Sequence, residues 1–397
     1  MDILVCNVGS TSLKFKLFGM PEQEVLASAK VERVGDRDNA IFHYENTRSG
    51  FRITLENQSI RSYTDGIRLF LAYLTHSAGS AMEDISQLDG IGFKTVLARD
   101  HYGVHRLDEA VLAGMRDYLD IAPVHNACYL EAIRQFQSFL PETPLIGVFE
   151  TEFHATIPLA RSLYGLPYEW YERFGIRRFG YHGASHRYIA ETIGERYGDG
   201  KLISCHLGGS CSICAIEDGQ SVDTSFGFSL QTGVLHANRV GDMDAYIIPF
   251  LLNRGLSMEE ILSGMDEHGG MLGISGVSND LRFITKKADS NERAALAIEM
   301  FCHDVTRYIG AYYVQLGGLA HLAFTGGIGE NSEPVRERVC EKLAVLGVEL
   351  DEEANRKIPA DGIISTPASR VMVHVIPADE ESVVVRKTYQ YLQESGV

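Results

Sequence analysis

The polar residues near the N-terminus have types and spacing that suit phosphate chemistry. Residues 3–16 read ILVCNVGSTSLKFK, in which two apolar runs flank a polar segment. This pattern predicts a strand, a tight turn and a second strand. Hydroxyls such as Ser10 and Ser12 can donate to phosphate oxygens, and Lys14 adds a positive charge. The Asn7 amide oxygen suits a Mg²⁺ shell. Taken alone, the stretch is equally compatible with an ordinary hairpin and a polar loop.

A second copy of this stretch favours the phosphate interpretation. Residues 202–215 read LISCHLGGSCSICA, and they begin about half of the 397-residue chain later. Both copies place an apolar strand, a Gly/Ser turn and another strand in the same order. An internal duplication of this kind predicts two similar lobes that face one nucleotide.

A glycine-rich segment is the third candidate for nucleotide contact. Residues 325–331 read TGGIGEN, after a predicted strand at 321–324 and before a predicted helix. This is the context in which backbone N–H groups approach a phosphate chain. The sequence contains no G-x-x-x-x-G-K-[ST], which excludes a Walker-type loop. The glycine cluster alone is a weak signal, but together with the two hairpins it predicts a three-part nucleotide cradle.

The elements that position these residues are expected in two domains. A chain of 397 residues is long enough for two hydrophobic cores, and its 45% hydrophobic and 22% charged content is typical of globular proteins. The net charge of −17 argues against nucleic acid or an anionic membrane as a partner. We see no signal peptide, and the apolar run 246–252 is too short to cross a bilayer. We therefore expect a cytoplasmic protein.

Apolar spacing predicts the individual strands and helices. Strands are expected at 25–33, within 40–55, at 91–97, 144–148, 321–324 and 371–376. Helices are expected at 66–75, 108–118, 126–139, from 185, at 246–253, 257–265, 292–316, 334–344 and from 380 to about 393, with a turn at 122–126. The long polar stretch 221–244 is predicted to have a function.

The seven cysteines are predicted to be reduced core thiols. Cys211 and Cys214 have the C-x-x-C spacing of metal and redox sites. On a strand, however, residues three apart point to opposite faces. Zinc or redox use of this pair is therefore disfavoured.

Segments along almost the whole chain resemble the acetate kinase family, within the sugar kinase/Hsp70/actin-type superfamily. These segments are NVGSTSLK, APVHN, VFETEFHATIP, GIRRFGYHGASH, CHLGGSCS, SVDTSFGF, NRVGDMD, GISGVSNDLR, FTGGIGEN and IPADEE. The resemblance implies an α/β fold of two ribonuclease-H-like lobes with a cleft between them that holds ATP. The first lobe would be 1–150, completed by the helix 380–397, and the second would be 151–379. A homodimer is also implied, with the aromatic stretch 158–179 as a candidate interface.

The resemblance also implies roles for particular residues. Asn7 and Glu380 would hold Mg²⁺, with Mn²⁺ as an alternative. Glu150, His182 and Arg239 would be catalytic. The acid-binding positions would be Lys94, Val96, His125, Tyr181 and Leu230. ATP or ADP would be bound by Ser10, Ser12, Lys14, His206, Leu207, Gly208, Gly209, Ser210, Asp280, Leu281, Arg282, Gly327, Ile328, Gly329, Glu330 and Asn331.

Several of these residues have a simpler interpretation from the sequence alone. Arg239 could form a loop salt bridge with a neighbour such as Asp242. His182 and His186 have a metal-ligand spacing on a helix, but the H-E-x-x-H pattern is absent. We prefer a phosphate-facing His182 and a structural His186. Glu380 could be an ordinary acidic residue at a helix N-terminus.

The chain departs from the family on the acid-binding side. Where the family usually has His-Arg-Val-Val-His-Gly-Gly, residues 93–99 read FKTVLAR. Lys94 thus replaces an arginine and loses the bidentate fork that holds a carboxylate. Arg99 could supply that guanidinium from a shifted position. Glu150 replaces a usual aspartate, and Tyr181 and Leu230 replace a usual phenylalanine and proline.

The preferred function is an ATP-dependent kinase that converts a short carboxylic acid, acetate or propionate, reversibly to an acyl phosphate. A carboxylate is already ionised at neutral pH, so that direct in-line transfer requires no general base. Two alternatives stay open. One is a weakened relative that binds nucleotide as a sensor, and the other is a kinase for a hydroxyl acceptor with Glu150 as the base.

Overall fold

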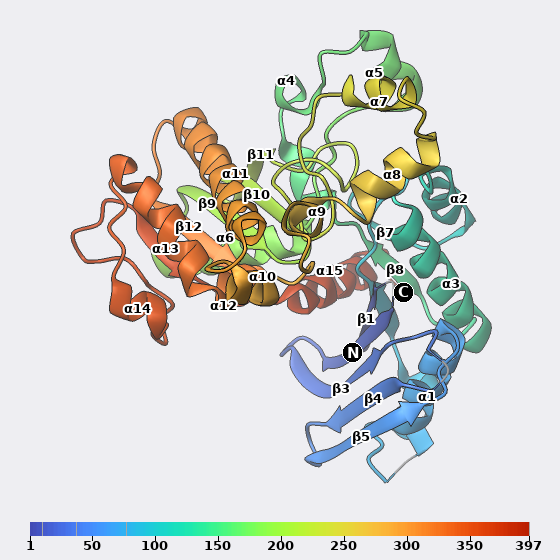
Figure 1. The fold of residues 1–397 in the computed structure, drawn as a ribbon. Coiled ribbons are helices and arrows are strands. Elements are labelled where there is room, and N and C mark those ends of the chain that lie inside the picture. The colour runs from blue at the N-terminus through green and yellow to red at the C-terminus, as the bar shows by residue number, and fades with distance from the viewer. Residues whose placement is uncertain (10, 37, 77, 397) are drawn as a thin grey trace. The chain divides into compact units, whose positions relative to one another are not determined.

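The computed structural model describes residues 1–9, 11–36, 38–76 and 78–396. The chain divides into two compact units, which are described separately (Figure 1). Unit 1 comprises Met1–Glu152 and Asp379–Val397, and unit 2 comprises Phe153–Ala378. Among the described residues, no helix has both the length and the apolar character needed to cross a membrane.

Unit 1 is built on one mixed sheet with the strand order β5-β4-β3-β2-β1-β6-β8-β7 in its described residues. Strands β1 to β5 are antiparallel, β6 and β8 run parallel to β1, and β7 is antiparallel to β8. The strands are β1 (Asp2–Gly9), β2 (Ser12–Gly19), β3 (Glu24–Glu32), β4 (Ala40–Asn46), β5 (Phe51–Gln58), β6 (Gly90–Phe93), β7 (Val104–Arg106) and β8 (Leu145–Val148).

Helices cover both faces of the central strands of unit 1. On one face, Phe15 of β2 stacks on Phe70 with a ring distance of 4.2 Å and meets Phe136 edge-on. On the other face, Val384 and Val385 pack into a cluster with the β1 residues. Strands that are buried on both faces read as continuous apolar runs, which explains the sequence of β1. The helices are α1 (Tyr63–His76), η1 (Ile85–Gln87), α2 (Glu109–Asp117), α3 (Pro123–Phe139) and α15 (Glu380–Ser395).

Two predicted boundaries in unit 1 were wrong. The turn predicted at 122–126 belongs to α3, which begins at Pro123. Proline suits the first turn of a helix, because the N–H that it lacks has no helical partner there. The strand predicted at 91–97 ends at Phe93, after which the chain leaves the ladder. This early end places residues 94–97 at the edge of the sheet.

Unit 2 contains a sheet with the order β11-β10-β9-β12-β13 in its described residues. Strands β9 and β10 form an antiparallel hairpin, and β12 runs parallel to both β9 and β13. The strands are β9 (Lys201–Leu207), β10 (Cys211–Glu217), β11 (Gln220–Thr224), β12 (His321–Thr325) and β13 (Met372–Val375). Both hairpins predicted from the duplicated stretch are thereby confirmed.

The helices of unit 2 cover this sheet and extend beyond it (Figure 1). The longest is α11, which is capped by Asn291 at its start and by Gly317 at its end. The helices are η2 (Glu152–Thr156), α4 (Leu159–Ser162), α5 (Tyr168–Phe174), α6 (Gly183–Tyr197), α7 (Ile247–Leu252), α8 (Met258–Asp266), α9 (Gly270–Ser275), α10 (Leu281–Lys287), α11 (Glu292–Leu316), α12 (Gly326–Asn331), α13 (Glu333–Lys342), η3 (Ala344–Leu346) and α14 (Glu352–Arg356).

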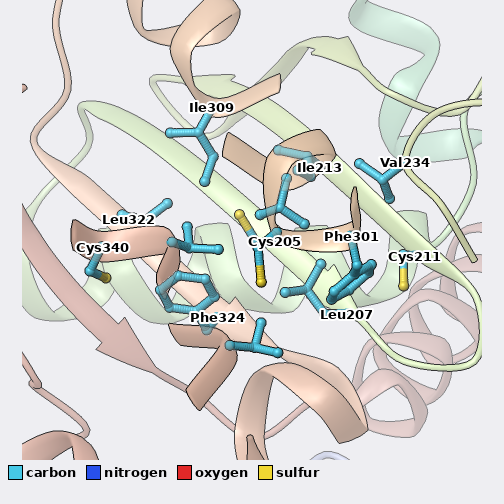
Figure 2. Packing of buried hydrophobic residues seen from close by; sticks show 14 of the residues in the cluster. Cys205, Leu207, Cys211, Ile213, Val234, Phe301, Ile309, Leu322, Phe324 and Cys340 are labelled. Atoms are coloured by element: carbon cyan, nitrogen blue, oxygen red, sulfur yellow. The ribbon is translucent and has the colours of Figure 1, made fainter. Parts of the chain in front are cut away.

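The main core of unit 2 lies between the sheet and α11. Cys205 and Phe324 from the strands meet Phe301 from the helix in this cluster (Figure 2). Cys211 belongs to the same cluster, whereas Cys214 belongs to the cluster on the other face of the sheet. Successive strand side chains alternate between faces, which separates the two thiols. Both cysteines are free and buried, as the sequence predicted for core thiols.

Candidate active site

In unit 1, polar residues gather where the parallel strands end. Cys6 of β1 pairs with Phe93 of β6, and Phe93 pairs with Gly147 of β8. The carboxyl ends of these strands therefore meet at one edge of the sheet. Ligands of open α/β sheets bind at such an edge. Three residues that the sequence singled out stand there, namely Asn7, Lys94 and Glu150.

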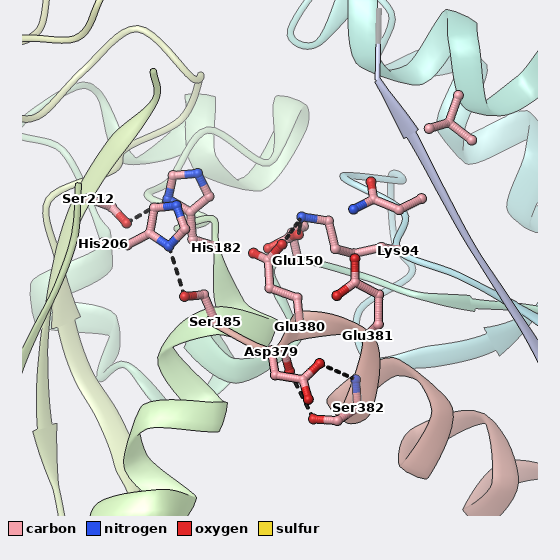
Figure 3. Close-up of polar contacts among 12 residues, drawn as sticks. Lys94, Glu150, His182, Ser185, His206, Ser212, Asp379, Glu380, Glu381 and Ser382 are labelled. Atoms are coloured by element: carbon pink, nitrogen blue, oxygen red, sulfur yellow. Dashed lines mark hydrogen bonds and ion pairs between the residues drawn. The ribbon is translucent and has the colours of Figure 1, made fainter. Parts of the chain in front are cut away.

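Lys94 bridges two carboxylates at this edge. Its ammonium lies 2.9 Å from Glu150 Oε1 and 2.9 Å from Glu380 Oε2 (Figure 3). Burial alone would lower the pKa of Lys94, but the two glutamates raise it well above its usual value. The lysine is therefore charged at neutral pH. Glu380 is the first residue of α15, whose N-cap residue Asp379 accepts a hydrogen bond from the Ser382 N–H.

Tyr129 orients the amide of Asn7. The hydroxyl of this buried tyrosine donates to Asn7 Oδ1 at 3.3 Å and accepts from the Val8 N–H at 3.1 Å. Burial raises the pKa of Tyr129, so that the phenol keeps its proton. Sequence reasoning missed Tyr129, because an apolar-flanked tyrosine on a helix gives no signal of a polar partner.

The donor set of unit 1 fits a hard divalent cation. Asn7 and Glu380 offer oxygen ligands, which Mg²⁺ prefers, and Mg²⁺ keeps several waters when few protein ligands are present. The described residues contain no group of three or more His, Cys, Asp or Glu side chains placed to hold a metal ion. Asn7 and Glu380 would therefore hold a Mg²⁺ that retains much of its water shell.

The hairpin of unit 1 places Lys14 beside Asn7. The two residues are direct cross-strand partners in the β1–β2 ladder, so that their side chains share a face of the sheet. Lys14 is exposed, and its ammonium forms no hydrogen bond or ion pair with another described residue. Ser12 closes the same hairpin opposite Gly9. Ser10, which was predicted to bind phosphate, lies outside the described residues.

The other residues of unit 1 that were predicted to bind the substrate acid do not take part in the Lys94 ion pairs. Val96 is buried, and His125 is exposed in the first turn of α3. Arg99 points to acidic neighbours, with Asp100 at 3.7 Å and Asp117 at 3.9 Å. The hypothesis that Arg99 supplies the guanidinium of the family's arginine stays a prediction.

In unit 2, His182 is held by packing and by one hydroxyl. It precedes α6 with a φ of +58° and stacks on His206 with a ring distance of 4.1 Å. Its Nδ1 lies 2.8 Å from Ser212 Oγ, and Ser185 Oγ lies 2.8 Å from His206 Nδ1 (Figure 3). These contacts fix the plane of the His182 ring.

His186 has a structural position, as the sequence analysis preferred. It is fully buried, with Nε2 at 2.7 Å from Ser212 Oγ and Nδ1 at 2.9 Å from Ser204 Oγ. Burial, together with His154 and His206, lowers the pKa of His186 well below its usual value. The ring is therefore neutral, and a hydrogen-bonded chain runs from Ser204 through His186 and Ser212 to His182. Sequence reasoning missed both serines, which stand on neighbouring strands.

The polar stretch 221–244 begins in β11 and continues as a loop that is anchored on α11 and carries Arg239. Asp242 accepts hydrogen bonds from the Gly233 N–H at 2.9 Å and the Tyr308 hydroxyl at 2.6 Å. Asp242 also lies 3.3 Å from Arg307, so that it does not form the salt bridge with Arg239 that the sequence left open.

Arg239 itself is a partly buried cation in that loop. Burial lowers its pKa, whereas Cys211 and Asp266 raise it. Its guanidinium forms no hydrogen bond or ion pair with another residue in the described part of the chain. A guanidinium with unfilled donors is suited to binding an anion such as a phosphoryl group.

Two glycine-containing loops of unit 2 approach one another at the ends of β9 and β12. His206 pairs with Thr325 at the ends of these parallel strands. A Cβ on Gly208 would lie 3.9 Å from the Gly327 nitrogen, and a Cβ on Gly326 would lie 2.8 Å from the Leu207 oxygen. The close backbone approach at Gly326, together with its φ of +76°, requires glycine there. The predicted nucleotide residues 206–210 and 327–331 are thus brought together.

Some side chains that were predicted to bind the nucleotide instead form hydrogen bonds with the backbone of their own glycine-rich segment. Glu330 Oε1 accepts hydrogen bonds from the Gly326 N–H at 2.9 Å and the Ala378 N–H at 3.0 Å. Asn331 donates to the Gly327 carbonyl at 3.0 Å. The buried Arg336 donates to the Gly329 and Glu330 carbonyls at 2.9 and 3.0 Å. Sequence reasoning missed Arg336, because an arginine within a helix is usually exposed.

The 280–282 segment and the predicted acyl-pocket residues also lie in unit 2. Asp280 caps α10 and pairs with the exposed Arg282 at 2.6 Å, whereas Leu281 is buried in the core. Tyr181 is buried and donates to the Phe228 carbonyl at 2.7 Å, and Leu230 is also buried. Leu281 therefore packs the core rather than offering a side chain to a ligand.

Known proteins match this sequence over almost its whole length. The sequence profile of the Acetokinase family matches residues 2–386. The chain belongs to the acetokinase family. It is 38% identical to the acetate kinase of Treponema denticola, over 98% of this chain and 99% of that protein. It is 39% identical to the acetate kinase of Bacillus subtilis, over 97% of this chain and 98% of that protein.

Solved structures of this family share the fold. The Porphyromonas gingivalis acetate kinase superposes with a TM-score of 0.87 at 33% identity, and covers 98% of this chain and 99% of its own. A propionate kinase from Francisella tularensis gives a TM-score of 0.87 at 31% identity, and covers 97% of this chain and 98% of its own. The predicted α/β fold class is confirmed, and this acetokinase-family chain is a carboxylate kinase.

Proposed function

We propose that the chain transfers the γ-phosphoryl group of ATP reversibly to the carboxylate of a short acid, acetate or propionate, and so forms an acyl phosphate and ADP. Support comes from the relatives that are named acetate kinase and propionate kinase. The observation that carries the proposal is Arg239, a partly buried guanidinium that forms no ion pair or hydrogen bond with another described residue. This cation is available for a transferring phosphoryl group.

The proposed reaction is a direct in-line displacement. A carboxylate oxygen of the acid attacks the γ-phosphorus, and the bond from that phosphorus to the bridging oxygen of ADP breaks. The acid is already ionised, so that no residue needs to remove a proton. Arg239 and His182 would stabilise the charge on the equatorial oxygens. Mg²⁺, held by Asn7 and Glu380, would neutralise phosphate charge.

The nucleotide would be held by backbone groups more than by side chains. The turn 208–210 and the start of α12 present closely spaced glycines, which allow a phosphate chain to approach the backbone. Ser12 and Lys14 of unit 1 would contact phosphate oxygens. Tyr181 and Leu230 would border the acyl group of the acid.

The test is hydroxylamine trapping with ATP, Mg²⁺ and a panel of formate, acetate, propionate and butyrate. We expect an acyl hydroxamate from acetate or propionate, and a loss of at least about 100-fold in the Arg239→Gln variant. Arg356→Gln, which removes an exposed and already paired guanidinium from α14 of the same unit, is the matched control. ATP binding without any hydroxamate would instead support the sensor alternative.

The structure disfavours a hydroxyl acceptor. That alternative needs Glu150 as a general base, but Glu150 Oε1 is engaged by the Lys94 ammonium at 2.9 Å. ADP formation with an alcohol, in the absence of hydroxamate, would overturn this view.

We also propose that the protein is a homodimer. Large apolar side chains are exposed on the segment 159–174 and on α7 and α8, and such a collection marks an interaction surface. These residues, here called the apolar surface, are Leu159, Leu166, Tyr168, Trp170, Phe174, Tyr246, Ile247, Phe250, Leu252, Leu256, Met258 and Leu262.

A further inference from the structure

Lys94 connects two carboxylates that come from distant parts of the sequence. Glu150 follows β8, and Glu380 begins α15. The ammonium is 2.9 Å from each, and the side chains of Lys94, Glu150 and Glu380 are only 17%, 6% and 16% exposed. Three charges are therefore held together largely away from water, where their interactions are only weakly screened.

This geometry does not suit a residue whose main task is to grip the substrate acid. An ammonium has three donors and no planar fork, and two carboxylates already occupy it. A substrate carboxylate would be a third anion on one positive charge. The lengths of the two side chains also fit one another. Lys94 is shorter than the arginine that the family usually has, and Glu150 is one methylene longer than the usual aspartate, so that the two charged groups can still meet.

We propose that Lys94 is a positioning residue that bridges Glu150 and Glu380 and lowers the affinity of the site for a divalent cation. The inference rests on the proposed function, which assigns Glu380 and Asn7 to Mg²⁺. Asn7 belongs to the same cluster, because Tyr129 donates to its oxygen and also lies close enough to Lys94 to interact with its charge.

The physical reason is electrostatic. A fixed positive charge within hydrogen-bond distance of both carboxylates offsets part of the negative potential that attracts a dication. Removal of that charge leaves two carboxylates facing one another, and a divalent cation relieves their repulsion. Metal binding therefore tightens when Lys94 is neutralised, although the shape of the site changes little with methionine in place of lysine.

The test measures Mn²⁺ binding to the full chain by electron paramagnetic resonance, without any turnover. We expect Lys94→Met to bind Mn²⁺ at least about tenfold more tightly than the unaltered chain. Lys94→Arg, which keeps the charge, should stay within about threefold. Lys30→Met is the matched control, because it removes an ammonium from another ion pair of unit 1. Unchanged or weaker binding in Lys94→Met, or equal tightening in Lys94→Arg, would overturn the proposal.

A second measurement covers the case in which Lys94→Met does not fold. In the ¹⁵N-lysine-labelled chain, the Lys94 Nζ resonance, assigned by its absence in Lys94→Arg, should shift as Mg²⁺ saturates the site. A resonance unaffected by Mg²⁺ would refute the bridge. These results are independent of turnover: hydroxamate formation with unchanged Mn²⁺ affinity in Lys94→Met would leave the proposed function standing and remove only this inference.

Discussion

Ser212 connects two histidines in unit 2, and its single proton orders the chain of hydrogen bonds. Because His186 is neutral, it carries one N–H and accepts at its other nitrogen. In the arrangement in which Ser204 donates to His186 and His186 donates to Ser212, the Ser212 hydroxyl still has its own proton to donate to His182 Nδ1. His182 then carries its own proton on Nε2, where it can donate to a phosphoryl oxygen.

The first prediction tests this role of Ser212. Ser212→Ala removes the partner of His182 Nδ1, and we expect the rate of hydroxamate formation to fall by about 10- to 100-fold, because a displaced catalytic group loses much of its effect. The KM for ATP should change less than kcat. The ¹⁵N shifts of His182 should also show that a fixed tautomer is lost. Ser290→Ala, at an exposed serine just before α11, is the control, and equal effects of both changes would contradict the assignment.

At the scale of elements, Arg336 ties the glycine-rich helix α12 to α14. Its guanidinium bonds to the Gly329 and Glu330 carbonyls and to Asn355, and the residue is only 2% exposed. These bonds satisfy carbonyls at the end of a short helix that would otherwise lack partners. The Arg336 guanidinium therefore holds in place the glycine-rich segment that is proposed to contact the nucleotide.

The second prediction follows from these bonds. Arg336→Met leaves buried carbonyls unsatisfied, and we expect unfolding to become easier by about 2–4 kcal/mol in urea titrations. The dissociation constant for ATP should rise by about tenfold or more in calorimetry, since the loop loses its support. Arg356→Gln is the control, because Arg356 lies on α14 in exposed ion pairs. A normal ATP affinity in Arg336→Met would refute the link.

A third prediction concerns the pairing of β12 and β13. His374 is buried, its Nε2 lies 3.1 Å from His321 Nδ1, and burial, with His321 and Arg196, lowers its pKa to about 4 while Asp361 opposes the shift. The folded state therefore disfavours the charged ring. The contribution of the neutral His374 ring to the free energy of unfolding is fully present above pH 6.5, the pKa of histidine in the unfolded chain. This contribution is lost as the pH falls from there towards the folded-state pKa of about 4.

The measurement is the urea-unfolding free energy between pH 7 and pH 4.5. In His374→Gln, which cannot take up this proton, we expect a shallower decline with falling pH. The decline will not vanish, because burial also lowers the pKa of His186 and lowers that of His236 to about 3. If the unfolding free energy of His374→Gln falls with pH as steeply as that of the unaltered chain, the His321–His374 pair does not contribute to the pH dependence.

For the whole molecule, the fourth prediction concerns the oligomeric state and follows from the apolar surface. Phe250 is 55% exposed and Tyr246 is 81% exposed, on and just before α7. We expect the unaltered chain to be a dimer by light scattering and the double variant Tyr246→Asp/Phe250→Asp to be a monomer, because charge on an apolar interface is not solvated there. Val345→Asp, at an exposed apolar residue outside this surface, should remain dimeric. An unaltered chain that is monomeric would exclude the dimer.

Local sequence patterns were sufficient to predict the α/β class, the two hairpins, most helices and the family. These features depend on local periodicity, on turn residues and on motifs such as TGGIGEN, which are read without knowledge of distant contacts. The sequence also predicted that Cys211 and Cys214 would face opposite sides of the sheet, because strand alternation is a local property. The beginning of α3 at Pro123 was missed because helix boundaries depend on packing as well as propensity.

The contacts between polar groups, in contrast, depend on long-range packing. Lys94 is far from Glu380 in the chain, yet the ammonium bridges that carboxylate to Glu150, because the parallel strands and α15 bring their ends to one edge of the sheet. In the same way, Ser212 reaches His182 and His186 across separate elements, and Asp242 turns to α11 and leaves Arg239 without a salt bridge. Such pairings depend on strand order and helix docking, and neither is encoded in the spacing of residues along a single segment.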